Sequence, residues 1–325
     1  DKRLIDYTME ALLRAGIRRF VLVVGHGAEE LQRVLTSTYG DAEFVFVLNP
    51  DYAKTNNIYS LYLARAEMER DDSLLLESDV IFEQGILDNC LHHPSPNVAI
   101  VAKLRPWMDG TVTKLDGTGA ISCFVSKNDM VDAELDQYYK TVNVYKLSRE
   151  FCRDKFFPFL QVYIQAKGLN EYYEEVLKVL TFIDRGTIVA SEVGDKLWYE
   201  IDDLQDLEIA GALFAEDAGR LRAFQRRYGG YWRFPALKDF CYLVNPFFPT
   251  PRFLQDMTRE FAPLLTSYPS GQNVQNLLAA KGFPSIRRVV RTPQRWERIV
   301  EVAAEHGAKL PAVPDSRALD EFLVK

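Results

Sequence analysis

Apolar runs and amphipathic segments take turns along the first ninety residues of the chain. Helical spacing of the apolar positions predicts helices, and continuous apolar runs predict strands. The predicted helices are 4–15, 28–35, 58–68 and 85–91, and the predicted strands between them are 20–24, 43–48 and 74–76. Strands and helices that alternate over short connections are typical of βαβ units, so this part of the chain predicts a mostly parallel sheet flanked by helices.

The middle of the chain predicts a more mixed pattern. Turn-rich residues 116–119 separate two strand-like segments, which is typical of a β-hairpin. The other predicted strands are 98–102, 140–147, 188–190 and 197–199, and the predicted helices are 151–166, 171–180 and 203–224. We therefore expect an α/β protein with a Rossmann-like mixed, mostly parallel sheet.

The pattern changes again after residue 215. A basic helix end and the pair Gly229-Gly230 indicate a linker at 216–230, and aromatic and proline residues are frequent beyond it. Two further helices are predicted, at 251–265 and 295–306. We expect residues 231–325 to form a small, mainly helical and irregular region.

The composition narrows the class of protein. The chain has 325 residues, which is enough for one or two domains. Its net charge of −7 argues against a nucleic-acid binder, and no apolar run reaches membrane-spanning length. The four cysteines are scattered without a CxxC pair, which is typical of reduced thiols in a cytoplasmic protein.

Two acidic clusters follow apolar runs. Leu74 to Leu76 predict a strand buried on both faces, with Asp79 at its C-terminal end, and Asp202 follows the short run 197–199. Ligands of open α/β sheets bind at this edge, and carboxylates are suitable ligands for the Mg²⁺ of a nucleotide. We expect Asp79 and Asp202 to hold one Mg²⁺. The alternative is that Asp79 caps a turn and Asp202 a helix.

Polar residues at 55–60 come next at the same expected edge. Asn56 and Asn57 could donate amide hydrogen bonds to a base, a ribose or a substrate. They are equally good helix caps, which is the simpler interpretation.

The loop 103–110 combines two cations, an indole and a carboxylate. Lys103 or a neighbouring arginine could bind a phosphate or phosphonate. Trp107 and Asp109 could receive a cationic amine by cation–π contact and charge pairing. The alternative is an ordinary solvated loop.

Three later residues add to this set. Lys140 and Asn143 follow two tyrosines at the start of a predicted strand, and Glu171 stands beside another pair of tyrosines. Each alone is more often a cap or a packing residue. Together they supply what a zwitterionic substrate would need.

Three motifs together resemble those of the small-molecule cytidylyltransferases, which are sugar-nucleotidyltransferase-like enzymes. The motifs are Asn49-Pro50 with Thr55-Asn56-Asn57-Ile58-Tyr59-Ser60, Leu76-Glu77-Ser78-Asp79-Val80, and Tyr199-Glu200-Ile201-Asp202-Asp203 with the residues up to Leu207. The resemblance covers residues 1 to about 212. Residues 107–111 and 139–143 are most similar to the 2-aminoethylphosphonate cytidylyltransferases, whose transferase domain is often fused to an aminotransferase-like domain.

The resemblance implies a reaction and a set of site residues. An oxygen of a phosphonate or phosphate, with 2-aminoethylphosphonate as the best guess, would attack the α-phosphorus of CTP and release pyrophosphate. Asp79 and Asp202 match the catalytic, metal-binding aspartates of the family. The substrate-pocket residues are expected at Asn56, Asn57, Lys103, Trp107, Asp109, Lys140, Asn143 and Glu171.

The chain departs from the family pattern at both ends. The resemblance implies a first strand with a Gly-rich phosphate loop, and residues 1–215 align beyond it. Residues 231–325 resemble the N-terminal arm of an aminotransferase, without room for a domain that binds pyridoxal phosphate. We expect that cofactor only in longer relatives. A homodimer is compatible with such an arm.

Two other functions stay open from the sequence. One keeps the fold and uses phosphocholine or a sugar phosphate as the acceptor. The other is a non-catalytic protein that binds a nucleotide or acts as an assembly partner, because the phosphate loop is missing from the expected alignment.

Overall fold

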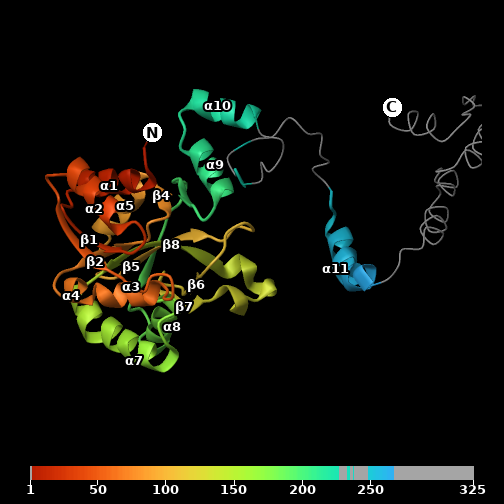
Figure 1. The fold of residues 1–325 in the computed structure, drawn as a ribbon. Helices are drawn as coiled ribbons and strands as arrows, with labels where there is room; N and C mark the ends of the chain where they lie inside the picture. The colour runs from red at the N-terminus through yellow and green to blue at the C-terminus, as the bar shows by residue number, and fades with distance from the viewer. Residues whose placement is uncertain (1, 227–232, 235–236, 238–247, 267–325) are drawn as a thin grey trace, which may run out of the picture. The chain divides into compact units, whose positions relative to one another are not determined.

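The structure is a computed structural model that describes residues 2–226, 233–234, 237 and 248–266 (Figure 1). The chain divides into two units, Asp1–Asp239 and Phe240–Lys325. In the second unit the structure describes helix α11 (Pro251–Thr266), where a helix was predicted. The helix predicted at 295–306 lies outside the described residues.

The first four elements of the first unit form one helix–strand layer. They are α1 (Leu4–Arg14), β1 (Arg19–Val24), α2 (Ala28–Thr38) and β2 (Glu43–Leu48). Strands β1 and β2 pair in parallel, with Phe20 opposite Phe44. Apolar faces of both helices pack against this pair through buried Met9, Leu12 and Leu35. The βαβ prediction for this stretch is confirmed.

The central sheet has the strand order β7-β6-β8-β5-β9, with β3 on the long strand β8. The strands are β3 (Ser73–Leu76), β5 (Val98–Lys103), β6 (Val112–Leu115), β7 (Ile121–Val125), β8 (Tyr138–Leu147) and β9 (Val189–Glu192). Strands β5 and β9 are parallel, and the pairings of β8 with its neighbours are antiparallel. The predicted α/β fold with a mixed sheet is confirmed, although the pairings in this central sheet are mostly antiparallel and not mostly parallel as predicted.

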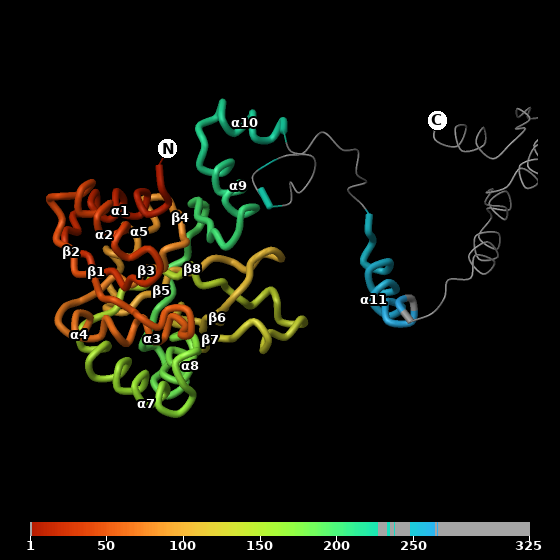
Figure 2. Tube along the Cα trace, in the orientation of Figure 1, coloured from red at the N-terminus to blue at the C-terminus, as the bar shows by residue number. Residues whose placement is uncertain are grey.

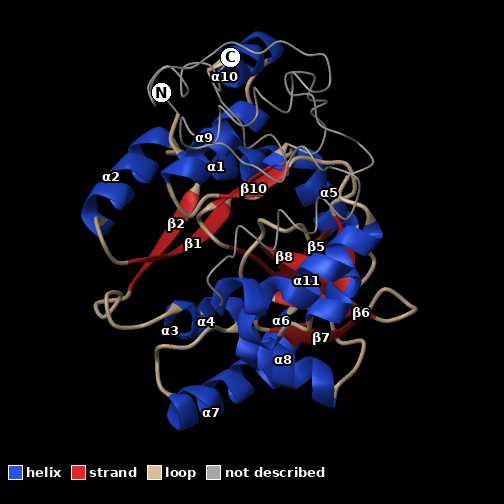
Figure 3. Ribbon diagram, turned by 90° about the vertical axis from the view of Figure 1, so that its right-hand side faces the viewer, coloured by secondary structure: helices blue, strands red, loops and turns tan. Residues whose placement is uncertain are grey.

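Helices cover the sheet on opposite faces (Figures 2 and 3). One face carries α5 (Gln84–His92) with α1 and α2, and the other carries α3, α7 and α8. The helices of this second group and the short helices that connect them are α3 (Asn57–Leu63), α4 (Arg65–Met68), α6 (Arg149–Phe151), the π-turn Cys152–Phe156, α7 (Phe157–Lys167) and α8 (Glu174–Ile183). None of the described helices is long and apolar enough to cross a membrane.

Three helices and one strand differ from their predictions. The helix predicted at 58–68 breaks at Ala64, and the one predicted at 203–224 is α9 (Leu204–Leu213) and α10 (Asp217–Gln225). Arg220 explains the second break, because its guanidinium donates to the carbonyls of Leu213 and Ala215, where α9 ends. The helix predicted at 151–166 contains the π-turn. Strand β3, predicted to be buried on both faces, is half-buried throughout.

A short ribbon of two strands joins distant parts of the chain. Strand β4 (Val80–Phe82) pairs with β10 (Trp198–Glu200) in antiparallel register, with Val80 opposite Glu200. The Ile201 N–H donates to the Asp79 carbonyl over 2.8 Å, which extends the pairing by one step. The residues just before β4 and just after β10 therefore lie side by side.

Candidate active site

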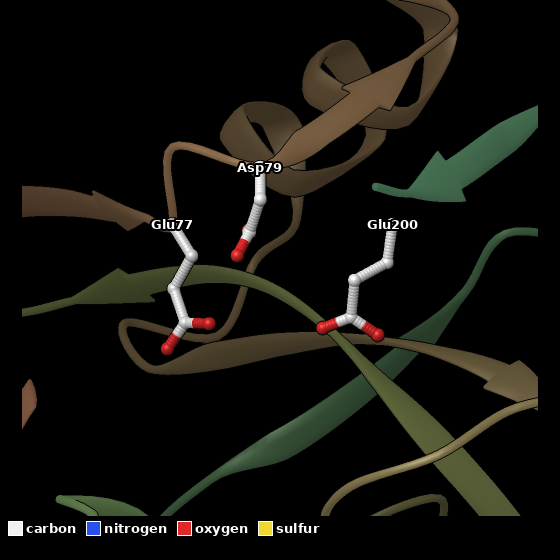
Figure 4. Close-up of side chains that lie close together, drawn as sticks. All are labelled: Glu77, Asp79 and Glu200. Carbon is white, nitrogen blue, oxygen red and sulfur yellow. The ribbon is translucent and has the colours of Figure 1, made fainter. Parts of the chain in front are cut away.

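Two acidic pairs meet where β4 and β10 join. Glu77 and Asp79 lie between β3 and β4, and Glu200 ends β10. Carboxylate oxygens of these three residues lie within 4.8 Å of one another, and Figure 4 shows the side chains converging. The structure thus brings Asp79 to Glu200 of the second acidic cluster, whereas the sequence predicted Asp202 as the partner of Asp79. Asp202 is exposed and two residues further on.

Burial and mutual repulsion disfavour charge on these carboxyl groups. Burial is the main cause of the raised pKa of Asp79, and the charge of Asp202 adds to it. Burial also raises the pKa of Glu77, with a further contribution from Asp79. The pKa of Glu200 rises to about 7, again through burial, although Lys140 opposes the shift. A divalent cation would relieve this repulsion, because it favours the ionised form of every carboxylate that it contacts.

The donor set fits Mg²⁺. One carboxylate oxygen of Asp79, Oδ1, is buried and has no hydrogen-bond partner in the described structure. A buried oxygen without a partner is costly, so it is available for a ligand. All the converging groups are carboxylates, which Mg²⁺ prefers over nitrogen or sulfur. Asp79 offers the oxygen without a partner and Glu200 lies beside it, whereas Asp202 lies outside this group of converging carboxylates.

Strand β8 places two of the predicted residues against the acidic cluster. Lys140 is 2% exposed, and its Nζ lies 3.1 Å from Glu200 Oε2. Asn143 Nδ2 donates to Glu77 Oε2 at 3.0 Å and to Glu200 Oε1 at 2.7 Å. Asn143 has a φ of 60°, a left-handed conformation that asparagine tolerates better than most residues. The turn of the backbone there aims the amide at both glutamates.

Asn57 connects the first helix turn of α3 to the same cluster. Its Nδ2 donates to Glu77 Oε1 at 3.2 Å, and its Oδ1 accepts the Tyr173 N–H at 3.0 Å. The Tyr173 hydroxyl donates to the same Glu77 oxygen at 3.0 Å. The Glu77 carboxylate thus accepts hydrogen bonds from Asn57, Asn143 and Tyr173. Because its oxygens are already engaged, we expect Glu77 to orient its neighbours and not to bind the cation.

Two predicted residues lie elsewhere. Asn56 caps α3, where its side chain accepts the Asn57 N–H at 2.8 Å, and its own N–H donates to Leu169. This is the simpler interpretation of the asparagine pair. Glu171 is half-buried and contributes its backbone carbonyl to the Ile58 N–H. The buried carboxylate of this segment is Glu174, three residues on.

The carboxyl group of Glu174 predicts a pH-dependent stability. Burial, with help from Glu77, raises its pKa to about 8, from an unfolded value near 4.5. Between these values the folded state binds more protons than the unfolded state, so stability falls as pH rises, by up to about 1.4 kcal/mol per pH unit. Urea unfolding at pH 5 to 8 should show a smaller slope for Glu174→Gln. An unchanged slope would contradict this, and exposed Glu208→Gln is the control.

A pocket of about 460 Å³ opens beside Glu200 and Asp202. Its walls come from the loop after β5, from residues 193–200 and from the start of α9. The lining residues that matter here are Arg105, Trp107, Asp109, Lys196, Asp206 and Arg233. Trp107 and Asp109, predicted for a substrate, and Asp202, predicted for a metal, all line this one pocket.

Two charged residues of the loop 103–110, Lys103 and Asp109, already have interaction partners. Lys103 Nζ donates to the Asp136 carbonyl and lies 4.4 Å from the centre of the Tyr139 ring. Asp109 pairs with Lys127 Nζ at 2.5 Å, and both side chains are more than half exposed. An exposed pair of this kind contributes little stability, so Asp109 can exchange its partner.

The sequence analysis missed Glu77, Glu200, Tyr173 and Glu174. A signal for the first two was present, because both acidic motifs have the same spacing, Glu77-Ser78-Asp79 and Glu200-Ile201-Asp202. Residues i and i+2 of an extended segment point to the same side, so each pair would present two carboxylates together. Tyr173 belongs to the pair of tyrosines noted beside Glu171, but the burial of Tyr173 and Glu174 depends on how α8 packs and has no local signal.

The fold is that of a nucleotidyltransferase. A solved CTP:phosphocholine cytidylyltransferase from Streptococcus pneumoniae superposes with a TM-score of 0.52 at 19% identity, over 66% of this chain and 86% of that structure. No protein-family model matches the chain.

Curated relatives narrow the class. The CMP-5'-(3-aminopropyl)phosphonate synthase of Streptomyces rubellomurinus is 30% identical over 279 residues, which is 85% of this chain and 44% of that protein. The CTP:phosphoglutamine cytidylyltransferase of Campylobacter jejuni is 25% identical over 64% of this chain and 87% of that protein. The chain is thus similar in sequence to cytidylyltransferases, and it spans less than half the length of the first of these relatives.

Proposed function

We propose that the protein transfers a cytidylyl group from CTP to an aminoalkylphosphonate, with 2-aminoethylphosphonate as the best candidate, in a Mg²⁺-dependent reaction. The observation that carries this proposal is the position of the acidic cluster at the edge of the pocket. Glu200 and Asp202 line that pocket, and carboxylate oxygens of Glu200, Asp79 and Glu77 lie within 4.8 Å of one another. The relative from Streptomyces, whose name specifies a CMP-aminopropylphosphonate, supports an acceptor of this class.

The reaction would be an in-line displacement. A phosphonate oxygen forms a bond to the α-phosphorus of CTP, and the bond to the bridging oxygen breaks, so that pyrophosphate leaves with the electron pair. When bound, Mg²⁺ would neutralise the phosphate oxygens during this step. Asp79, Glu200 and Asp202 would hold it, and Lys140 and Asn143 keep Glu200 in place.

The pocket has complementary groups for the two ends of such an acceptor. Arg105 and Lys196 are proposed to bind the phosphonate, because both are cations on its wall. Trp107 and Asp109 are proposed to bind the amine, with the amine replacing Lys127 as the partner of Asp109. Cytoplasmic location and a homodimer stay predictions from the sequence.

Initial rates of pyrophosphate release with a panel of acceptors test this function. The full-length protein with CTP and Mg²⁺ should prefer 2-aminoethylphosphonate or its aminopropyl homologue over ethylphosphonate, which lacks the amine. Loss of one charged contact in a pocket of this kind predicts about a tenfold or larger decrease in kcat/KM. A preference for phosphocholine or a sugar phosphate would contradict the acceptor class and leave cytidylyl transfer intact.

A further inference from the structure

Two residues beyond α10 pack against β4, β10 and α9, next to the acidic loop, which is defined as residues 200–203. Phe234 is 3% exposed and lies in a cluster with Ile81 of β4 and Tyr199 of β10. Its ring meets the Phe224 ring edge-on, with 4.8 Å between centroids. Phe234 therefore holds residues 233–234 against the β4–β10 ribbon, beside which the two acidic motifs lie.

Arg233 forms hydrogen bonds with two side chains, Asp206 of α9 and Tyr199 of β10. One guanidinium nitrogen donates to Asp206 Oδ1 at 3.0 Å and to the Tyr199 hydroxyl at 3.1 Å. The Tyr199 hydroxyl donates to the same Asp206 oxygen at 3.0 Å. Arg233 and Asp206 are only 19% and 16% exposed, so this pair is shielded from water more than a surface ion pair is.

Asp206 also forms hydrogen bonds with two residues of the acidic loop, Asp202 and Asp203. Its second oxygen, Oδ2, accepts the backbone N–H of Asp202 at 3.4 Å, and its own N–H donates to Asp203 Oδ1 at 2.9 Å. Asp206 thus holds the turn between Glu200 and α9 from both sides. Without Arg233, the Asp206 carboxylate would lose its cation and a reason to keep this orientation.

We infer that Arg233 is a positioning residue for the cation site, acting through Asp206 on the loop that presents Asp202. The inference rests on the proposed function for the role of that site. The segment after α10 would then contribute to the site of the transferase unit, since Arg233 also lines the acceptor pocket. Groups that orient metal ligands commonly change metal affinity by about 10- to 100-fold when they are removed.

Binding of Mn²⁺ alone, followed by the electron paramagnetic resonance of the free ion, tests this inference in the full-length protein without nucleotide. Arg233→Ala should weaken Mn²⁺ binding about tenfold. Arg233→Lys should recover most of it, because a single nitrogen makes both contacts in the structure. Arg222→Ala, an exposed arginine on α10 that does not line the pocket, should bind Mn²⁺ as the parent does.

The possible results separate this inference from the proposed function. Equal Mn²⁺ affinity of Arg233→Ala and the parent overturns the positioning role and leaves the proposed function intact. Absence of Mn²⁺ binding by the parent contradicts the metal site and the inference together. If Arg233→Ala melts at a much lower temperature, Asp206→Asn provides the second variant, and it should weaken Mn²⁺ binding to the same extent.

Discussion

Replacement of Asp79 by Asn should lower the rate of CTP-dependent pyrophosphate release by about 1000-fold. A metal that neutralises transferring phosphates contributes several kcal/mol to the barrier, and Asp79 carries the buried oxygen without a partner that is available to bind it. The variant should fold normally. The raised pKa of Asp79 indicates that burial penalises its charge, so a neutral amide should leave the free energy of unfolding unchanged or higher.

Measuring both activity and the free energy of unfolding distinguishes loss of a metal ligand from loss of the folded structure. The substitution Asp217→Asn, at a fully exposed position of α10, is the matched control and should change neither quantity. Parent-like turnover by Asp79→Asn would remove Asp79 from the mechanism. A large loss of stability in Asp79→Asn would show that the carboxylate serves the fold instead.

Replacement of Lys140 by Met should destabilise the protein by about 3 kcal/mol, because it leaves Glu200 as a partly buried charge without its cation. The pKa of Glu200, already about 7, would rise further without Lys140. The loss should therefore grow as pH rises above 7, because there Glu200 is ionised in the folded parent but still holds its proton in the folded variant. Urea unfolding at pH 6 and pH 8 measures both the size and the trend.

A second substitution should restore much of this stability. In Lys140→Met with Glu200→Gln the buried pair is replaced by neutral groups, which is often neutral for stability. Lys178→Met, which removes an exposed pair with Asp129, should cost less than about 1 kcal/mol. Equal losses for Lys140→Met and Lys178→Met would mean that burial gives the Lys140 pair no special role.

Hydrophobic patterning predicted the elements of the fold better than their ends. The continuous run 43–48 became β2 without change, and its whole length pairs in parallel with β1. The break between α9 and α10 was not predictable from helical spacing, and the Arg220 guanidinium stabilises it by donating to the carbonyls of Leu213 and Ala215. The half-burial of β3 depends on which strands pair beside it, and the sequence of the strand does not contain that information.

The candidate site was predicted in part for a similar reason. Asp79 and Asp202 end apolar runs, a position that fitted a metal site or a cap, and the family resemblance favoured the metal site. Lys140 is an alternating strand residue like its neighbours, and only the pairing of β8 shows that it faces Glu200 in the interior. Contacts between residues far apart in the chain decide which polar side chains are buried together.

Phosphorus NMR of the reaction products tests the central claim most directly. The full-length protein, incubated with CTP, 2-aminoethylphosphonate and Mg²⁺, should form CMP joined to the phosphonate through a P–O–P linkage, with one pyrophosphate per product. Removal of divalent metal by EDTA should stop the reaction, and excess Mg²⁺ should restore it. Absence of any CMP conjugate with aminoalkyl phosphonates or phosphates, or undiminished formation in EDTA, would contradict Mg²⁺-dependent cytidylyl transfer at the acidic cluster of Asp79 and Glu200.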